Sequence, residues 1–185
     1  MSDLGGRSVR VAWAQDAPAL ARLQLTYWAE RLGSPASGGP GVGLPSDAEV
    51  AATWDTSLRR PGDSRNRVLV ALEGPALVGY AVLQPDPDPD ADPVRDAQLA
   101  ELAVDPAHRA QGHGSRLLHA CVETLEADRF SRVSAWLDSD DDTGRAFLTS
   151  SGWGPDGAHR ELDADGTGRR VVRQVRLHAG LTDPA

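Results

Sequence analysis

Hydrophobic and polar residues follow two different periods along this chain, and these periods predict strands and helices respectively. Short runs that alternate, or that are continuously apolar between turn residues, indicate strands. These runs are residues 8–13, 66–72, 75–83, 97–104, 132–137, 159–162 and 170–178. The pair Glu73-Gly74 predicts a hairpin between the second and third runs, and Asp165-Gly166 predicts a turn between the last two.

Apolar residues three or four positions apart predict four helices between these strands. Their expected ranges are residues 17–32, 46–57, 112–128 and 143–151. Asp16 is the predicted N-cap of the first helix, and Ser46 with Glu49 has the pattern of a capping box for the second. The resulting order, β-α-α-β-β-β-α-β-α-β-β, predicts a mixed α/β fold with a central sheet.

Two segments interrupt this pattern and are predicted to be loops. Gly33–Pro45 contains five glycines and three prolines, which is typical of a mobile loop. Gln84–Pro93 (QPDPDPDADP) alternates proline with aspartate, so it is expected to be extended and solvated. Since no repeat or break in composition marks a second domain, we expect one domain over residues 1–185.

The composition is that of an ordinary globular protein, with 40% hydrophobic and 25% charged residues. The single cysteine, Cys121, excludes a disulfide framework and a cysteine-based zinc cluster. The longest apolar runs are far shorter than the roughly 20 residues of a membrane span, and the chain does not open with a signal-peptide pattern. We therefore expect a cytoplasmic protein without a membrane partner.

Charge narrows the functions that fit the chain. All 19 basic residues are arginines and 27 residues are acidic, which gives a formal net charge of −8. Without lysine the chain forms neither a Schiff base nor a Walker-type phosphate loop. The net negative charge disfavours nucleic-acid binding and favours a cationic partner.

The segment 99–118 (LAELAVDPAHRAQGHGSRLL) joins a predicted strand to a helix that opens at Gly112–Gly114. Small residues let a ligand approach the backbone, and the free N–H groups of a helix start attract phosphate. Arg109 and Arg116 add positive charge there, whereas Leu117 stands where a dinucleotide fingerprint needs its third glycine. Spacing alone leaves open a tight turn that binds no ligand.

Arg109–Gly114 (RAQGHG) resembles the R/Q-x-x-G-x-G/A signature of the GNAT superfamily of N-acetyltransferases. Glu101–Pro106 (ELAVDP) and Ala146–Trp153 (AFLTSSGW) are also similar to the family, with Trp153 in place of phenylalanine. The order of elements fits the family over nearly the whole chain. The resemblance implies a mostly antiparallel sheet of about six to seven strands flanked by about four helices.

The resemblance further implies acetyl-CoA as co-substrate, with no metal. The turn's amides would hold the pyrophosphate, the preceding strand would hold the pantetheine, and an N–H near Val104 would polarise the thioester carbonyl. The residues implied in binding are Leu102, Ala103, Val104, Arg109, Ala110, Gln111, Gly112, His113, Gly114 and Ser115.

Members of the family generally transfer the acyl group directly to a primary amine, which must first lose a proton. The carboxylates of Glu101 and Asp138 are the candidate bases, although each could be a solvated or ion-paired side chain. Leu148 stands where relatives often carry a tyrosine acid, so the general acid is unassigned. Asp138, Asp140 and Asp142 mimic the opening of a calcium loop but lack its later ligands, so a capping turn that attracts substrate is expected there.

The sequence thus predicts an N-acetyltransferase acting on a small cationic amine or a peptide N-terminus. The acceptor is expected between the first two helices, the loop 33–45 and the strand ends bearing Glu101 and Asp138, with Trp28 as a possible lining residue. The alternative is a non-catalytic acyl-CoA-binding sensor or partner module, which Leu148 favours. The resemblance is also compatible with a homodimer.

Overall fold

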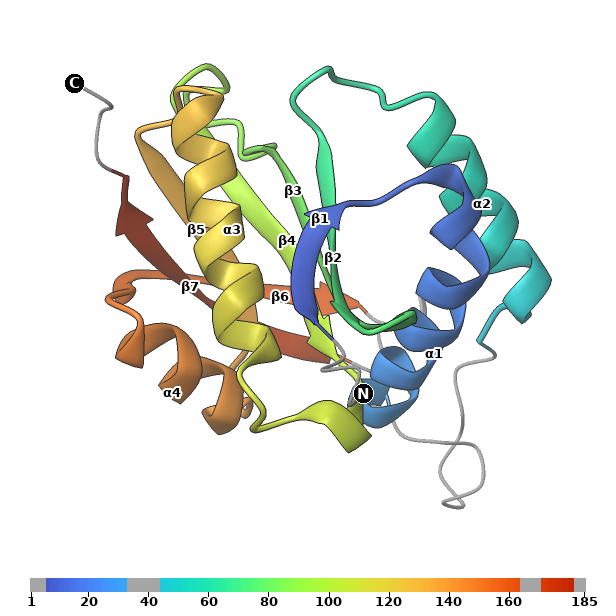
Figure 1. Cartoon of the computed structure of the whole chain (residues 1–185). Helices are drawn as coiled ribbons and strands as arrows, with labels where there is room; N and C mark the ends of the chain where they lie inside the picture. Colours follow the sequence, from blue (N-terminus) through green and yellow to red (C-terminus); the bar gives the residue numbers. More distant parts are fainter. Residues whose placement is uncertain (1–5, 33–43, 164–170, 182–185) are drawn as a thin grey trace. The chain divides into compact units, whose positions relative to one another are not determined.

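The computed structural model describes residues 6–32, 44–163 and 171–181, which contain seven strands and four α-helices (Figure 1). The strands are β1 (Arg7–Val11), β2 (Arg67–Glu73), β3 (Ala76–Pro85), β4 (Asp96–Val104), β5 (Arg132–Asp138), β6 (Gly154–Asp163) and β7 (Val171–Gly180). The helices are α1 (Ala17–Leu32), α2 (Asp47–Arg59), α3 (His113–Ala127) and α4 (Asp142–Ser150), with the 3-10 turns η1 (Ala14–Asp16) and η3 (Pro106–His108). The predicted order of elements is confirmed.

The strands form one sheet in the order β1-β2-β3-β4-β5-β7-β6. The pairs β1/β2, β2/β3, β5/β7 and β6/β7 are antiparallel, while β4 and β5 pair in parallel over Asp96–Gln98 and Arg132–Ser134. This confirms the predicted mixed α/β fold with a mostly antiparallel sheet. Contacts group the chain into two compact units, one of residues 1–83 and 101–123 and one of residues 84–100 and 124–185. The single domain remains a prediction.

The core of the first unit lies on both sides of β3, because successive residues of a strand face opposite ways. Tyr80 is fully buried and packs edge-to-face against Trp54 of α2, with ring centroids 5.8 Å apart. Its neighbour Gly79 faces α3, and a Cβ there would lie 3.1 Å from Leu117 Cδ1 and 3.0 Å from the Ala103 carbonyl oxygen. The missing side chain therefore lets β3 approach both β4 and α3.

The close approach at Gly79 predicts a loss of stability in Gly79→Ala, because the added methyl group meets a backbone oxygen. We expect the free energy of unfolding to fall by about 1–3 kcal/mol in chemical denaturation. Gly154→Ala is the matched control, since Gly154 also lies in a strand and has no positive φ angle. A Cβ added to Gly154 would have nothing within 4 Å. Equal effects of the two substitutions would contradict the packing argument.

The predicted N-terminal cap is found at α2, whereas the cap predicted for α1 serves another element. In the capping box, Ser46 N–H donates to Glu49 Oε2 (2.8 Å), and Glu49 N–H donates to Ser46 Oγ (3.3 Å). Asp16 instead ends η1, where its carboxylate accepts Trp13 N–H (2.7 Å) and pairs with Arg10 (2.7 Å). Its capping thus serves the turn before α1. The predicted turn at Asp165-Gly166 and residues 33–43 of the predicted loop lie outside the described residues.

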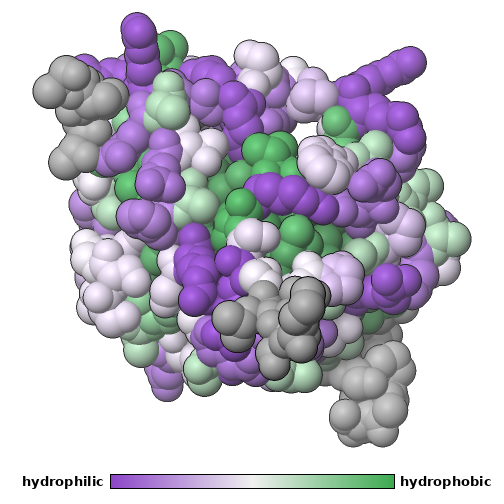
Figure 2. Space-filling model, viewed as in Figure 1, coloured by the Kyte–Doolittle hydropathy of each residue, from purple (hydrophilic) through white to green (hydrophobic). Residues whose placement is uncertain are grey.

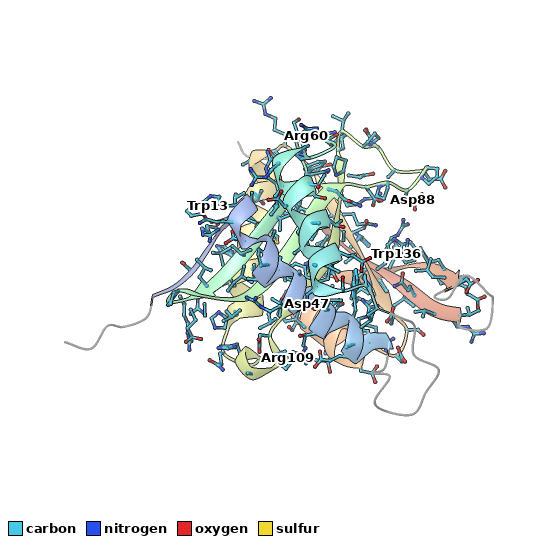
Figure 3. The ribbon with its side chains drawn as sticks, turned by 90° about the vertical axis from the view of Figure 1, so that its right-hand side faces the viewer. Trp13, Asp47, Arg60, Asp88, Arg109 and Trp136 are labelled. Carbon is cyan, nitrogen blue, oxygen red and sulfur yellow. The ribbon has the colours of Figure 1, made fainter. Side chains whose placement is uncertain are left out.

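In the second unit, the acidic loop after β3 is less solvated than predicted. Asp86 is only 5% exposed and accepts a hydrogen bond from Ser134 Oγ at 2.6 Å. Asp88 forms an ion pair with Arg176 Nη1 at 3.0 Å, and the Arg176 guanidinium also lies over the Trp136 ring. Figure 3 labels Asp88 and Trp136. These specific partners, which alternation of proline and aspartate does not reveal, hold the loop.

Hydrophilic side chains cover much of the molecular face in Figure 2, as the charged composition predicts.

Candidate active site

The glycine-rich turn between η3 and α3 has the backbone geometry of an anion site. Ala110 and Gly112 adopt positive φ angles of 57° and 85°, so the backbone is left-handed on each side of Gln111. Arg116 N–H donates to the Gly112 carbonyl at 3.1 Å. The amides of residues 113–115 lie in the turn before this bond, where a helix offers them no acceptor. The positive end of the α3 dipole reinforces the preference for an anion.

Hydrogen bonds from distant strands hold this turn in place. The Gln111 side chain donates to the Ala107 carbonyl (3.1 Å), and Arg7 Nη1 of β1 donates to the Gln111 carbonyl (3.0 Å). Asp105 accepts Ala107 N–H at 2.8 Å and donates its own N–H to the Val78 carbonyl of β3 at 2.8 Å. The turn is therefore preorganised by β1, β3 and its own side chains.

Two arginines flank the turn, as the sequence predicted. Arg109 Nε donates to the Val104 carbonyl at 3.2 Å, and its guanidinium pairs with Glu30 of α1 (Figure 3). Arg116 lies beside the other side of the turn, because a Cβ on Gly112 would be 3.4 Å from its Nη1. Arg116 adds to the field that the helix start creates for an anion, whereas the carboxylate of Glu30 compensates the charge of Arg109.

His113 of the signature contributes its backbone to the turn but not its ring. The ring is buried, with Nε2 3.2 Å from Glu73 Oε2, and Arg7 Nε lies 3.2 Å from the other oxygen of Glu73. Desolvation raises the pKa of Glu73, but the hydrogen bonds from Arg7 and His113 outweigh it and hold the pKa below its usual value. Sequence reasoning missed Glu73, because this contact spans 40 residues and no local pattern signals it.

Glu101 lies on β4, three residues before Val104, and is half-buried against α1. Its Oε2 accepts from Gln24 Nε2 at 2.8 Å, and its Oε1 accepts from Trp28 Nε1 at 3.1 Å. Burial raises the pKa of Glu101, and the hydrogen bonds oppose that rise only in part. A carboxylate with a raised pKa is suited to take a proton near neutral pH.

A second layer of side chains lies behind Glu101. Trp54 Nε1 of α2 donates to Gln24 Oε1 at 2.9 Å. The Tyr80 hydroxyl is buried beside the Glu101 carboxylate, and burial together with that negative charge raises the pKa of Tyr80. Sequence reasoning missed Gln24, Trp54 and Tyr80. A signal existed only for Gln24, which precedes Trp28 by four residues and so shares its helix face.

Asp138, the other candidate base, ends β5 and accepts a hydrogen bond from Gln174 Nε2 at 2.9 Å. It belongs to the second unit, whereas Glu101 belongs to the first. Leu148 is buried in α4 and offers no acid. Burial raises the pKa of the Cys121 thiol to about 12, which makes it a poor nucleophile.

Within residues 6–32, 44–163 and 171–181, no three His, Cys, Asp or Glu side chains are grouped so as to hold a metal ion. No helix of those same residues is long and apolar enough to cross a membrane.

The chain is similar in sequence to curated acetyltransferases. The chain is 33% identical over 141 residues to the mycothiol acetyltransferase of Kineococcus radiotolerans, covering 76% of this chain and 40% of that protein. It is 40% identical over 92 residues to the mycothiol acetyltransferase of Streptomyces avermitilis, covering 49% of this chain and 27% of that protein. The chain thus spans about two fifths or less of the length of these relatives.

Solved structures share the fold over nearly the whole chain. The structure of yncA from Salmonella typhimurium with its cofactor acetyl-CoA has a TM-score of 0.71 at 17% identity, covering 97% of this chain and 96% of that one. The ribosomal-protein-S18-alanine N-acetyltransferase from Escherichia coli has a TM-score of 0.66 at 16% identity, covering 97% of both chains.

The model of the acetyltransferase (GNAT) family matches residues 39–153. That range contains β4, the turn with positive φ angles at Ala110 and Gly112, and the start of α3. The match to the family model, together with the similarity to the mycothiol acetyltransferase of Kineococcus radiotolerans, places the chain in the GNAT family of acetyltransferases.

Proposed function

We propose that this chain transfers an acetyl group from acetyl-CoA to a primary amine by direct attack. The observation that carries the proposal is the position of Glu101, a half-buried carboxylate on the same strand that leads into the anion-binding turn. A base and a donor site are thereby joined by a few residues of β4. Membership of an acetyltransferase family supports the same chemistry.

The donor's pyrophosphate would lie on the amides of residues 111–115, with Arg109 and Arg116 beside it. The backbone of Leu102–Val104 would bind the pantetheine arm. The parallel pairing of β4 with β5 covers only Asp96–Gln98, so these later residues of β4 lie beyond the paired stretch. A backbone N–H near Val104 would stabilise the oxyanion that develops on the thioester carbonyl.

In the transfer step, Glu101 accepts a proton from the ammonium form of the acceptor, and the free amine attacks the thioester carbon. The new C–N bond forms as the C–S bond breaks, and CoA leaves as a thiolate. The attacking nitrogen gives up its second proton to water as the amide forms, and water protonates the thiolate. Because the pKa of a thiol is about 8.5, the thiolate is a tolerable leaving group even though Leu148 provides no general acid. Asp138 is the second candidate for the base.

The acceptor is proposed to be a small cationic amine. The net charge of −8 supports a cation, as does the carboxylate of Glu101 facing α1. The relatives named mycothiol acetyltransferase make a mycothiol-related amine the first acceptor to test. A peptide N-terminus is the second, because one structural neighbour is named as a ribosomal-protein alanine N-acetyltransferase.

Calorimetry and a turnover assay test the proposal together. Acetyl-CoA is titrated into the protein, with CoA, NAD and ATP as comparators, and the acceptors are then screened for release of free thiol. Micromolar binding of acetyl-CoA with thiol release for an amine is the expected result. Binding without turnover for every amine would favour the non-catalytic acyl-CoA-binding module, and preference for NAD or ATP would overturn the donor site.

A further inference from the structure

We infer that Trp54, which does not hydrogen-bond Glu101, acts through Gln24 as a positioning residue that keeps Glu101 ready to accept a proton. The inference deepens the proposed function, because it rests on Glu101 being the base. The inference comes from the direction of two consecutive hydrogen bonds, which link Trp54 of α2 to Gln24 of α1 and Gln24 to Glu101 of β4 in the first unit.

The donor and the acceptor of each of these two hydrogen bonds follow from the chemistry of the side chains. An indole N–H can donate but cannot accept. The 2.9 Å contact from Trp54 Nε1 therefore requires the carbonyl end of the Gln24 amide to face Trp54. The NH₂ end must then face Glu101, 2.8 Å from Oε2. Trp54 thus determines which way round the Gln24 amide stands.

The second oxygen of Glu101 also faces an obligatory donor, because Trp28 Nε1 lies 3.1 Å from Oε1. Neither neighbour can accept a hydrogen bond from a protonated Glu101. Both contacts therefore favour the carboxylate over the acid, and they oppose the effect of burial. A base needs this balance, because it must be ionised before the amine arrives.

The other groups that face Glu101 do not replace this function. Arg31 of α1 lowers the pKa of Glu101 by its charge, and its Nη1 donates to the Tyr27 hydroxyl at 2.8 Å. Tyr80 of β3 interacts with Glu101, but burial keeps its hydroxyl neutral. Gln24 and the Tyr80 hydroxyl can each present either a donor or an acceptor to Glu101. Of these two, the Gln24 amide is the one whose orientation a further hydrogen bond, from Trp54, fixes.

Trp54→Phe is the test, since it keeps an aromatic ring against Tyr80 but removes the N–H. The Gln24 amide is then free to turn its carbonyl toward Glu101 and accept a proton from it. We expect the pKa of Glu101, followed by ¹³C NMR of its side-chain carboxyl, to rise by about one unit. The signal is assigned by its loss in Glu101→Gln. The acidic limb of the pH–rate profile should move to higher pH with it, because the rate follows the unprotonated base.

Trp13→Phe is the matched control, because Trp13 is 56% exposed and lies outside this chain of hydrogen bonds. It should leave the titration of Glu101 unchanged. Gln24→Met removes the amide itself and should raise the pKa of Glu101 on its own. In that background Trp54→Phe should add no further shift, since the two residues act as one unit.

An unchanged pKa in Trp54→Phe, or an equal shift in the Gln24→Met background, would overturn the inference. An unchanged titration of Glu101 in Gln24→Met overturns the inference equally, even if Trp54→Phe does not fold, because Trp54 is inferred to act only through the Gln24 amide. The NMR titration needs no acetyl transfer. A shifted pKa in a chain that acetylates no amine would therefore reject the proposed function and leave the inference about Trp54 intact.

Discussion

Glu101→Gln is expected to lower kcat for acetyl transfer by about 10²–10⁴-fold, the usual contribution of a general base. The amide cannot take a proton from the acceptor amine. Its NH₂ end must also face either Gln24 or Trp28, both of which donate to the present carboxylate. Binding of acetyl-CoA should stay unchanged, because Glu101 precedes the residues proposed to hold the donor. Steady-state kinetics with the best acceptor, together with calorimetry, separate the two effects.

Glu123→Gln is the control for removing a carboxylate. Glu123 is exposed on α3, where its Oε1 lies 3.4 Å from Nε2 of the neighbouring His119. The substitution should leave kcat and Kd at their wild-type values. Asp138→Asn distinguishes the second candidate: if it abolishes turnover while Glu101→Gln retains it, the base is Asp138 and the role proposed for Glu101 is wrong.

Gly112→Glu is expected to weaken acetyl-CoA binding by more than about 100-fold, since 1.4 kcal/mol corresponds to about tenfold in Kd. The loss of affinity comes from the new carboxylate, which lies where the pyrophosphate is proposed to bind and repels its charge. The side chain at φ +85° also costs about 1–2 kcal/mol, but that strain lowers the stability of the fold rather than the affinity. Calorimetry with acetyl-CoA on the folded variant measures the loss directly.

Gly152→Glu controls for the strain of a positive φ angle and for the added charge. Gly152 has a φ of +89° after α4, and nothing lies within 4 Å of its Cβ position. This variant should lose stability but bind acetyl-CoA as the wild type does. Equal losses of affinity in both variants would mean that Gly112 acts through the fold rather than through the donor site.

Features that depend on neighbours in the sequence could be predicted well. The capping box at Ser46, the hairpin at Gly74 and the turn at Gly112 each rest on a few adjacent residues, whose own chemistry dictates the local backbone. The order of elements followed from hydrophobic periodicity for the same reason. Glu101 could be named as a candidate because the resemblance to the family places it on the strand beside the donor, near where substrate amines enter in similar enzymes.

Features that depend on distant contacts could not be predicted. Asp86 is buried because Ser134 lies opposite it, 48 residues later in the chain. In the sequence, Gln24 looks like an ordinary polar residue of a helix. Its role depends on Trp54 and Glu101, which the fold places at the carbonyl and the NH₂ end of its amide. In such cases a side chain's environment is decided by tertiary packing, and a hydrophobic or polar pattern carries no record of it.

The bond between Arg7 and Gln111 joins residues 104 positions apart. The donor turn therefore reaches its final form only after the first strand has docked onto the sheet. A purification tag or fusion partner that displaces β1 would therefore disturb a turn far away in sequence. The resulting loss of binding would then look like low intrinsic activity. Binding and turnover are best measured on protein tagged at its carboxyl end.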